Sequence, residues 1–113
     1  MIDLYGIPNC NTVKKARQWL EEHAIEYRFH DFKREGVDPD RLDRWLDRLG
    51  WETLVNRRGT TWRRLPGEAR ADLNRDKARE LLLAHASLVK RPVLEAGEAL
   101  WVGFDPDRYE ALR

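Results

Sequence analysis

The sequence predicts an α/β fold, a four-stranded mixed sheet with an all-helical insertion between its second and third strands. Three observations support this fold. The chain begins with strand, turn, helix and strand patterns, continues with amphipathic helices, and ends with two short strands before a last helix. Because 113 residues is the length of one ordinary domain, we expect a single domain over residues 1–113, with the insertion at about residues 36–86.

The N-terminal segment predicts a βαβ unit. Residues 2–6 alternate between the two faces of a strand, and residues 7–11 contain turn-forming side chains. Apolar residues then recur at helical spacing over residues 13–20, and residues 25–32 form a second strand pattern. A strand, a helix and a strand in succession predict a parallel pair joined by a right-handed crossover.

The middle of the chain predicts helices separated by a loop. Asp38 is the expected N-cap of a helix that continues to Leu49, with an apolar stripe along one face. Residues 56–64 have no period and are rich in Arg, Gly and Thr, so we expect a loop there. A short helix is expected near Pro66 and a longer one over residues 74–85.

The C-terminal segment predicts a β-hairpin followed by a helix. Residues 92–95 and 99–102 are strand patterns, and Gly97 between them can adopt the positive φ of a tight turn. Asp105 and Pro106 are suited to cap and begin the last helix.

Composition limits the partners and the location of the protein. The formal net charge of +1 lacks the basic excess of a general nucleic-acid binder. No apolar run approaches the ~20 residues of a membrane span, and the N-terminus has no signal-peptide pattern. A single cysteine excludes an internal disulfide, and the three histidines lack metal-ligand spacing. We therefore expect a cytoplasmic protein with no nucleic-acid partner, no membrane partner and no metal.

The single cysteine, Cys10, lies where the first strand gives way to the first helix. Free N–H groups and the positive end of the helix dipole favour a thiolate at such a position. Asn9, Asn11 and Thr12 can cap the helix or donate hydrogen bonds to the sulfur. Most free cysteines are small buried hydrophobes, but the polar, turn-forming neighbours of Cys10 favour a reactive nucleophile.

Position 13 decides how such a nucleophile would complete a reaction. A second cysteine three residues after Cys10 would form the familiar CxxC redox motif, but the residue there is Val13. Cys10 therefore cannot resolve its own mixed disulfide, and the resolving thiol must come from another molecule. Glutathione is the natural candidate.

Basic side chains could complete the site. Arg57 and Arg58 lie in an arginine-rich loop, and Arg91 directly precedes Pro92 at the start of a strand. Guanidinium groups bind carboxylates and oxyanions through paired hydrogen bonds, although a single arginine in such a loop is more commonly a solvated charge. Lys14 can likewise be a substrate contact or a solvated side chain.

Four separated motifs resemble the ArsC/Spx family and, within it, the YffB-type reductases. They are GIPNCNTVKKA at residues 6–16, NRRGTTW at 56–62, KRPV at 90–93 and VGF at 102–104. They occur in order over essentially the whole chain.

The resemblance implies a thioredoxin-like fold with Pro92 in a cis peptide bond beside Cys10 and Arg91 reaching toward the thiol. In the arsenate reductases of this family, the cysteine attacks arsenate and glutathione resolves the adduct. Cys10 and Arg91 match this pattern as catalytic residues. The substrate- or glutathione-binding residues that we expect are Asn11, Thr12, Lys14, Arg57, Arg58 and Pro92.

Two departures from the family pattern affect the expected substrate. The arsenate enzymes carry two further arginines, at positions occupied here by Asn56 and Val102. We therefore expect a glutathione-dependent thiol reductase with glutathione as cosubstrate, glutaredoxin as a further partner and no bound cofactor. The alternatives are an arsenate reductase and an Spx-like regulator that binds RNA polymerase. In the regulator, the CxxC redox switch could not operate, because Val13 replaces the second cysteine.

Overall fold

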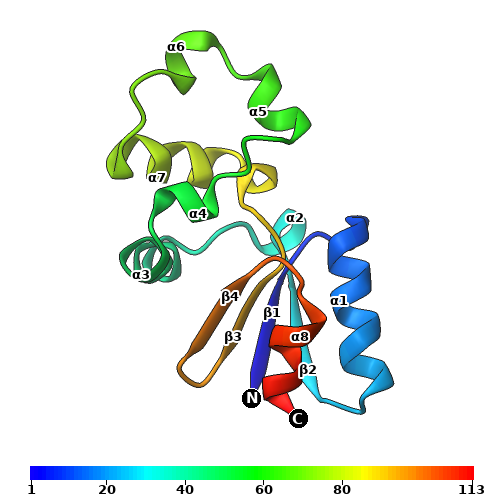
Figure 1. Cartoon of the computed structure of the whole chain (residues 1–113). Helices are drawn as coiled ribbons and strands as arrows, with labels where there is room; N and C mark the ends of the chain where they lie inside the picture. Colours follow the sequence, from blue (N-terminus) through cyan, green and yellow to red (C-terminus); the bar gives the residue numbers. More distant parts are fainter. The chain divides into compact units, whose positions relative to one another are not determined.

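A computed structural model describes all residues from 1 to 113, and Figure 1 shows the order of its helices and strands. The chain groups into two units, which are described separately. The first contains residues 1–32 and 91–113, and the second contains residues 33–90. None of the helices has the length and apolar character needed to cross a membrane.

The first unit is built on a four-stranded sheet with the order β2-β1-β3-β4. Its strands are β1 (Ile2–Gly6), β2 (Tyr27–Asp31), β3 (Val93–Ala96) and β4 (Ala99–Val102). β1 pairs in parallel with β2 and antiparallel with β3, and β3 pairs antiparallel with β4. The structure therefore confirms the mixed sheet, with every helix of the insertion between β2 and β3.

One face of this sheet carries the core of the first unit. The helix α1 (Asn11–Glu22) and the short helix α8 (Pro106–Tyr109), which continues into a 3-10 turn, pack on the same face of the sheet. Each fully buried leucine there contributes about 1.5–3 kcal/mol relative to an exposed one. The fully buried residues of this cluster are Leu4, Ala16, Leu20, Leu94 and Tyr109.

The end of β1 and the start of α1 pack closely because one residue is glycine. A Cβ added at Gly6 would lie 2.7 Å from Cγ2 of Val13. Val13 itself is fully buried. This contact fixes the first turn of α1 against the end of β1, on either side of Cys10.

The second unit is helical. α3 (Pro39–Leu49) and α7 (Arg75–Ala84) are joined by Arg79, whose Nε donates to Oδ1 of Asp43 at 2.6 Å. The predicted N-cap Asp38 is confirmed, because its side chain accepts from Arg41 N at 2.9 Å. Asn74, which was expected only as the start of a helix, is the N-cap of α7 and accepts from Lys77 N at 2.9 Å. The helices from β2 to β3 are α2 (Phe32–Glu35), α3 (Pro39–Leu49), α4 (Trp51–Leu54), α5 (Thr60–Arg64), α6 (Gly67–Arg70), α7 (Arg75–Ala84) and the 3-10 helix η1 (Ala86–Leu88).

Two local predictions were wrong. Residues 60–64 were expected in a loop, but they form α5, a helix too short to show an apolar period. The second strand was expected from Ile25 but begins at Tyr27. The reason is that Ala24 adopts a positive φ of 56°, and Ile25 N–H donates to Leu20 O at 2.9 Å, so these residues end α1.

Candidate active site

Cys10 forms the junction between a tight turn and α1. Its N–H donates to Ile7 O at 3.1 Å, and its carbonyl accepts from Lys14 N at 2.9 Å. These two bonds make Cys10 the N-cap residue, with extended backbone angles of φ −85° and ψ 127°. The side chain is half-buried. The sulfur is therefore held at the N-terminus of a twelve-residue helix and stays accessible to solvent.

The surroundings of Cys10 lower the pKa of its thiol. Partial burial raises this pKa, but backbone N–H groups of Val13 and Thr12, together with the charge and hydrogen bond of Arg91, outweigh that effect. The sulfur does not complete a regular N-cap hydrogen bond; the two N–H groups nevertheless stabilise the thiolate. A larger fraction of Cys10 is therefore in the nucleophilic form at neutral pH than for an ordinary cysteine.

The register of the sheet brings Arg91 to the sulfur. Tyr5 near the end of β1 pairs with Val93 at the start of β3, so the residues before β3 lie at the sheet edge from which the Cys10 turn leaves. The Arg91–Pro92 peptide bond is cis, as the resemblance implies. Pro92 is buried, and its carbonyl accepts from Gly103 N at 2.8 Å.

The other expected residues of α1 are placed differently around Cys10. Asn11, Thr12 and Lys14 are all exposed. Thr12 acts on the sulfur through its backbone N–H, as does Val13. From the sequence, Val13 was expected only as an apolar helix residue that replaces a second cysteine. The spacing of an N-cap residue and its third helical residue is the signal that could have identified this donor.

Arg57 and Arg58 lie in the second unit, where they line a pocket of about 310 Å³ with Lys90. Arg58 N donates to Asn56 Oδ1 at 3.1 Å, which holds the loop in a tight turn. The Arg57 guanidinium carbon lies 5.4 Å from the ring centroid of Trp51. Lys90 was not among the expected binding residues, although it belongs to the KRPV motif. The pocket gathers three cationic side chains against one acidic side chain, Glu52, and this excess of positive charge is suited to carboxylates or other anions.

The backbone around this pocket is clamped at two points. Asn56 N donates to Leu88 O at 2.9 Å, and Lys90 N donates to Leu54 O at 2.7 Å. Val55 and Val89 form an isolated antiparallel bridge between these bonds. The cationic side chains therefore extend from a fixed pair of backbone segments.

The chemistry that these residues can perform is that of a stabilised thiolate. A half-buried sulfur with a lowered pKa, next to a guanidinium, can attack a disulfide or another electrophile. No group of three or more His, Cys, Asp or Glu side chains is close enough together to hold a metal ion.

Comparison with known proteins identifies relatives along the whole chain. The ArsC family model matches residues 5–112. An uncharacterized protein from Haemophilus influenzae is 43% identical over 112 residues, which are 98% of this chain and 97% of that protein. The global transcriptional regulator Spx of Listeria innocua is 29% identical and is covered over 82% of its length by 95% of this chain.

Solved structures agree in sequence and fold. A YffB protein is 52% identical with a TM-score of 0.95, over 98% of this chain and 97% of that one. An arsenate reductase (ArsC) related protein from Brucella melitensis is 55% identical with a TM-score of 0.79, over 97% and 92% of the two chains. The glutaredoxin-like NrdH-redoxin of Escherichia coli, at 15% identity and a TM-score of 0.52 over 99% of this chain and 93% of its own, shows the fold alone. The chain thus belongs to the ArsC family and has a thioredoxin-like fold.

Proposed function

We propose that this protein is a glutathione-dependent thiol reductase that uses Cys10 as its only nucleophile. The observation that carries the proposal is the lowered pKa of the Cys10 thiol beside Arg91. Membership of a family that includes arsenate reductase-related proteins supports thiol-based reduction in general. The reaction would take place in the cytoplasm, where glutathione keeps thiols reduced.

The reaction proceeds in two exchanges. The Cys10 thiolate attacks the glutathione sulfur of a mixed disulfide, RS–SG, and the substrate sulfur leaves as the thiolate RS⁻, which takes up a proton. The enzyme then carries a Cys10–glutathione disulfide. A second glutathione, as its thiolate, attacks the glutathione sulfur of this disulfide, so that Cys10 leaves as a thiolate and oxidised glutathione is released. In total, RS–SG and one reduced glutathione give RSH and oxidised glutathione, so that the substrate sulfur is reduced and the sulfur of the incoming glutathione is oxidised.

Each residue near the sulfur has a role in these exchanges. Arg91 stabilises the thiolate before attack and again when Cys10 leaves. The N–H groups of Thr12 and Val13 do the same from the helix N-terminus. We assign Asn11 and Lys14, which are exposed and close to Cys10 in sequence, to the surface that receives glutathione or substrate. Pro92 was expected there too, but it is buried, and we assign it to the placement of Arg91.

The pocket of the second unit is assigned to an anionic group. Arg57, Arg58 and Lys90 would bind a carboxylate of glutathione or of the substrate, an interaction for which guanidinium groups are well shaped. Glutaredoxin is the protein partner that we propose for removing glutathione from Cys10 when free glutathione is scarce. No bound cofactor is needed, because the electrons come from thiols.

The test is an adduct experiment. We expect one glutathione on the protein after incubation with oxidised glutathione, detected by intact-mass spectrometry, and none on Cys10→Ser. Reduced glutathione should then release the adduct. An unmodified wild-type Cys10, or a thiol that titrates like a free cysteine, would rule out the proposal.

Arsenate reduction is a second candidate, supported by Cys10 with Arg91 and by the relative described as arsenate reductase related. Asn56 and Val102 replace two arginines of the oxyanion site, which argues against it. Turnover of arsenate with glutathione and glutaredoxin, lost in Cys10→Ser and faster than turnover of glutathione mixed disulfides, would favour this candidate.

A regulatory role is a third candidate, because relatives of nearly full coverage are global transcriptional regulators. Such a role would require binding to RNA polymerase without a CxxC switch. Capture of purified RNA polymerase by wild-type protein and equally by Cys10→Ser would favour the regulator over the reductase.

A further inference from the structure

The exposed face of α1 has an unusual order of charges. Lys14, Lys15 and Arg17 occupy its first half, whereas Glu21 and Glu22 occupy its last turn. The first turn holds no acidic residue, and the last turn holds no basic residue. The helix is therefore positive near Cys10 and negative at its far end.

This order does not serve the stability of the helix. The helix dipole favours acidic residues at the N-terminus and basic residues at the C-terminus, the opposite of what α1 has. Arg17 also precedes Glu21 by four residues, which is the weaker order for such a pair. Local rules broken without a gain in stability are expected where a surface serves binding.

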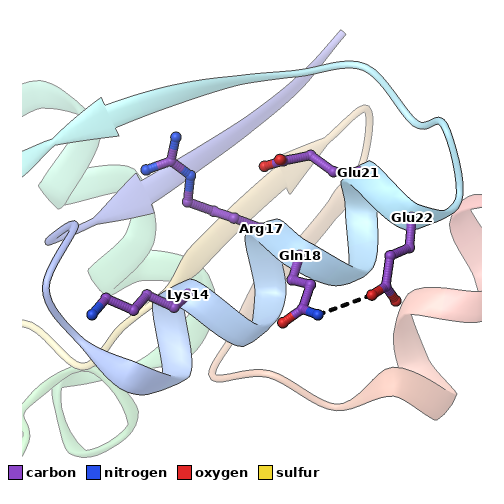
Figure 2. Close-up of a pocket in the computed structure, with 5 residues that line it drawn as sticks. All are labelled: Lys14, Arg17, Gln18, Glu21 and Glu22. Atoms are coloured by element: carbon purple, nitrogen blue, oxygen red, sulfur yellow. Dashed lines mark hydrogen bonds between the residues drawn. The ribbon is translucent and has the colours of Figure 1, made fainter.

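These charges line an open, shallow groove of about 530 Å³ on the surface of α1 alone, formed by Lys14, Arg17, Gln18, Glu21 and Glu22. Figure 2 shows Lys14 toward the start of the helix and Glu22 toward its end, with the Gln18 amide donating to Glu22 at 2.9 Å. The Lys14 ammonium makes no hydrogen bond or ion pair, so its charge is available to a ligand.

Two of the lining side chains are held in place from β2. Arg17 Nε donates to the Tyr27 hydroxyl at 3.0 Å, and this hydroxyl donates to Glu21 Oε2 at 2.6 Å. The Arg17 guanidinium carbon also lies 4.1 Å from the centroid of the Phe29 ring. The Arg17 and Glu21 side chains, which lie above the helix in Figure 2, are therefore ordered without a ligand.

The groove is aligned with the nucleophile. Lys14, Gln18 and Glu22 follow at steps of four residues along one ridge of α1, and Cys10 precedes this ridge as the N-cap residue of the helix. With a rise of about 1.5 Å per residue, Lys14 lies about 6 Å and Glu22 about 18 Å along the axis from Cys10.

We propose that this groove binds an extended peptide segment of a protein substrate, next to the substrate cysteine whose glutathione disulfide Cys10 attacks. At about 3.4 Å per extended residue, an acidic side chain about two residues from that cysteine reaches Lys14, and a basic side chain about five residues away reaches Glu22. This inference rests on the proposed reductase function and names its substrate class. Cys10 takes the glutathione, and the peptide cysteine leaves as a thiolate.

The test uses two charge-swapped peptides with a central cysteine joined to glutathione. One carries Glu two residues and Lys five residues from the cysteine on both sides, so the chain direction does not matter. The other carries Lys and Glu exchanged, with the same composition and net charge. At low salt we expect wild-type protein to release the first peptide about fivefold faster than the second. The reason is that one exposed ion pair changes an affinity by about 1.4–5-fold.

Matched variants identify the groove as the cause. The double variant Lys14→Glu, Glu22→Lys should prefer the second peptide, and its melting temperature should not fall, because its charges then suit the helix dipole. Lys15→Glu, the same charge change outside this groove, should keep the wild-type preference.

The outcomes separate this inference from the proposed function. Equal release of both peptides by wild-type protein, or an unchanged preference in the double variant, would overturn the groove while Cys10 still reacts with oxidised glutathione. Free glutathione could also abolish the preference between the two peptides in the wild type but not in the double variant. That result would assign the groove to glutathione instead of a peptide. If neither the peptides nor oxidised glutathione modifies Cys10, the reductase function itself fails.

Discussion

The Arg91 guanidinium hydrogen-bonds the sulfur of Cys10, and its charge lowers the pKa of that thiol. In the sequence, Cys10 precedes and Arg91 follows the whole helical insertion. They meet because β1 and β3 are neighbours in the sheet. The acidity of the nucleophile therefore depends on tertiary structure as well as on the helix N-terminus.

Replacing Arg91 by Ala should raise the pKa of Cys10, because the thiolate loses a hydrogen bond and a positive charge. At neutral pH we expect alkylation of Cys10 by iodoacetamide to slow about threefold, since a partly exposed charge-assisted hydrogen bond is weakened by solvent. The measurement is the alkylation rate as a function of pH. Arg91→Lys, which keeps the charge, should lie between the two; an alanine variant with the wild-type profile would contradict the assignment.

Val13→Cys should allow the new thiol to form an internal disulfide with Cys10. The N-cap residue and its third helical residue bring their side chains together at a helix start, and Cys10 and Val13 occupy these positions. After treatment with oxidised glutathione, we expect the wild type to keep one glutathione and Val13→Cys to lose it to an internal disulfide. Intact mass under non-reducing conditions distinguishes the two, and a persistent adduct on the variant would count against this geometry.

The free energy of unfolding should depend on pH through the carboxyl group of Asp3. Burial raises the pKa of Asp3, but hydrogen bonds from His30 and Arg28 lower it by more than burial raises it. The net pKa is therefore below the ordinary value of 3.8. A lowered carboxyl pKa contributes stability that is present above about pH 4 and is lost as pH falls through the folded-state value. We expect Asp3→Asn to be less stable by about 1 kcal/mol at pH 7.

The difference between wild type and Asp3→Asn should shrink below about pH 4, measured by urea unfolding over a pH series. A constant difference between pH 7 and pH 2 would mean that the ion pairs of Asp3 do not stabilise the fold.

Gly6→Ala should destabilise the protein by about 1–3 kcal/mol, the usual cost of overpacking a core. The new methyl group would lie 2.7 Å from Cγ2 of Val13, which is fully buried. Thermal unfolding measures the loss. Adding Val13→Ala to Gly6→Ala should cost less than the sum of the two single changes; additive losses would show that the two sites do not clash.

Tyr109→Phe should leave stability unchanged or raise it by about 0.5–1 kcal/mol. The Tyr109 hydroxyl is buried without a hydrogen-bond partner, among the rings of Trp19, Trp101 and Phe104. Burial raises its pKa. Urea unfolding should show the gain, and a loss above about 1 kcal/mol would show that the hydroxyl is satisfied in solution.

The sequence was sufficient for the sheet because its strands are short, amphipathic and bounded by turn residues. Asp38 and Asp105 could be identified as caps, since capping is a local interaction. The helix α5 was missed because five residues show no apolar period. β2 was predicted to begin two residues too early because Ala24 adopts a left-handed conformation, which is not expected of an alanine.

The site was predictable only where local sequence signals mark its residues. Cys10 was identified by its place before a helix, and Arg91 by its motif. Lys90 beside Arg57 was not found, because their meeting depends on the backbone bonds between residues 54–56 and 88–90. The groove on α1 was also missed, because its charges resemble an ordinary solvated helix face until β2 fixes Arg17.

The pairing of β3 with β1 has a consequence during synthesis. Cys10 leaves the ribosome long before Arg91, since chains emerge from the N-terminus. Until β3 is made and docks beside β1, the nascent chain lacks the guanidinium that lowers the pKa of the thiol. The cysteine should thus lack part of its final reactivity through most of translation and gain it when the last strands complete the sheet.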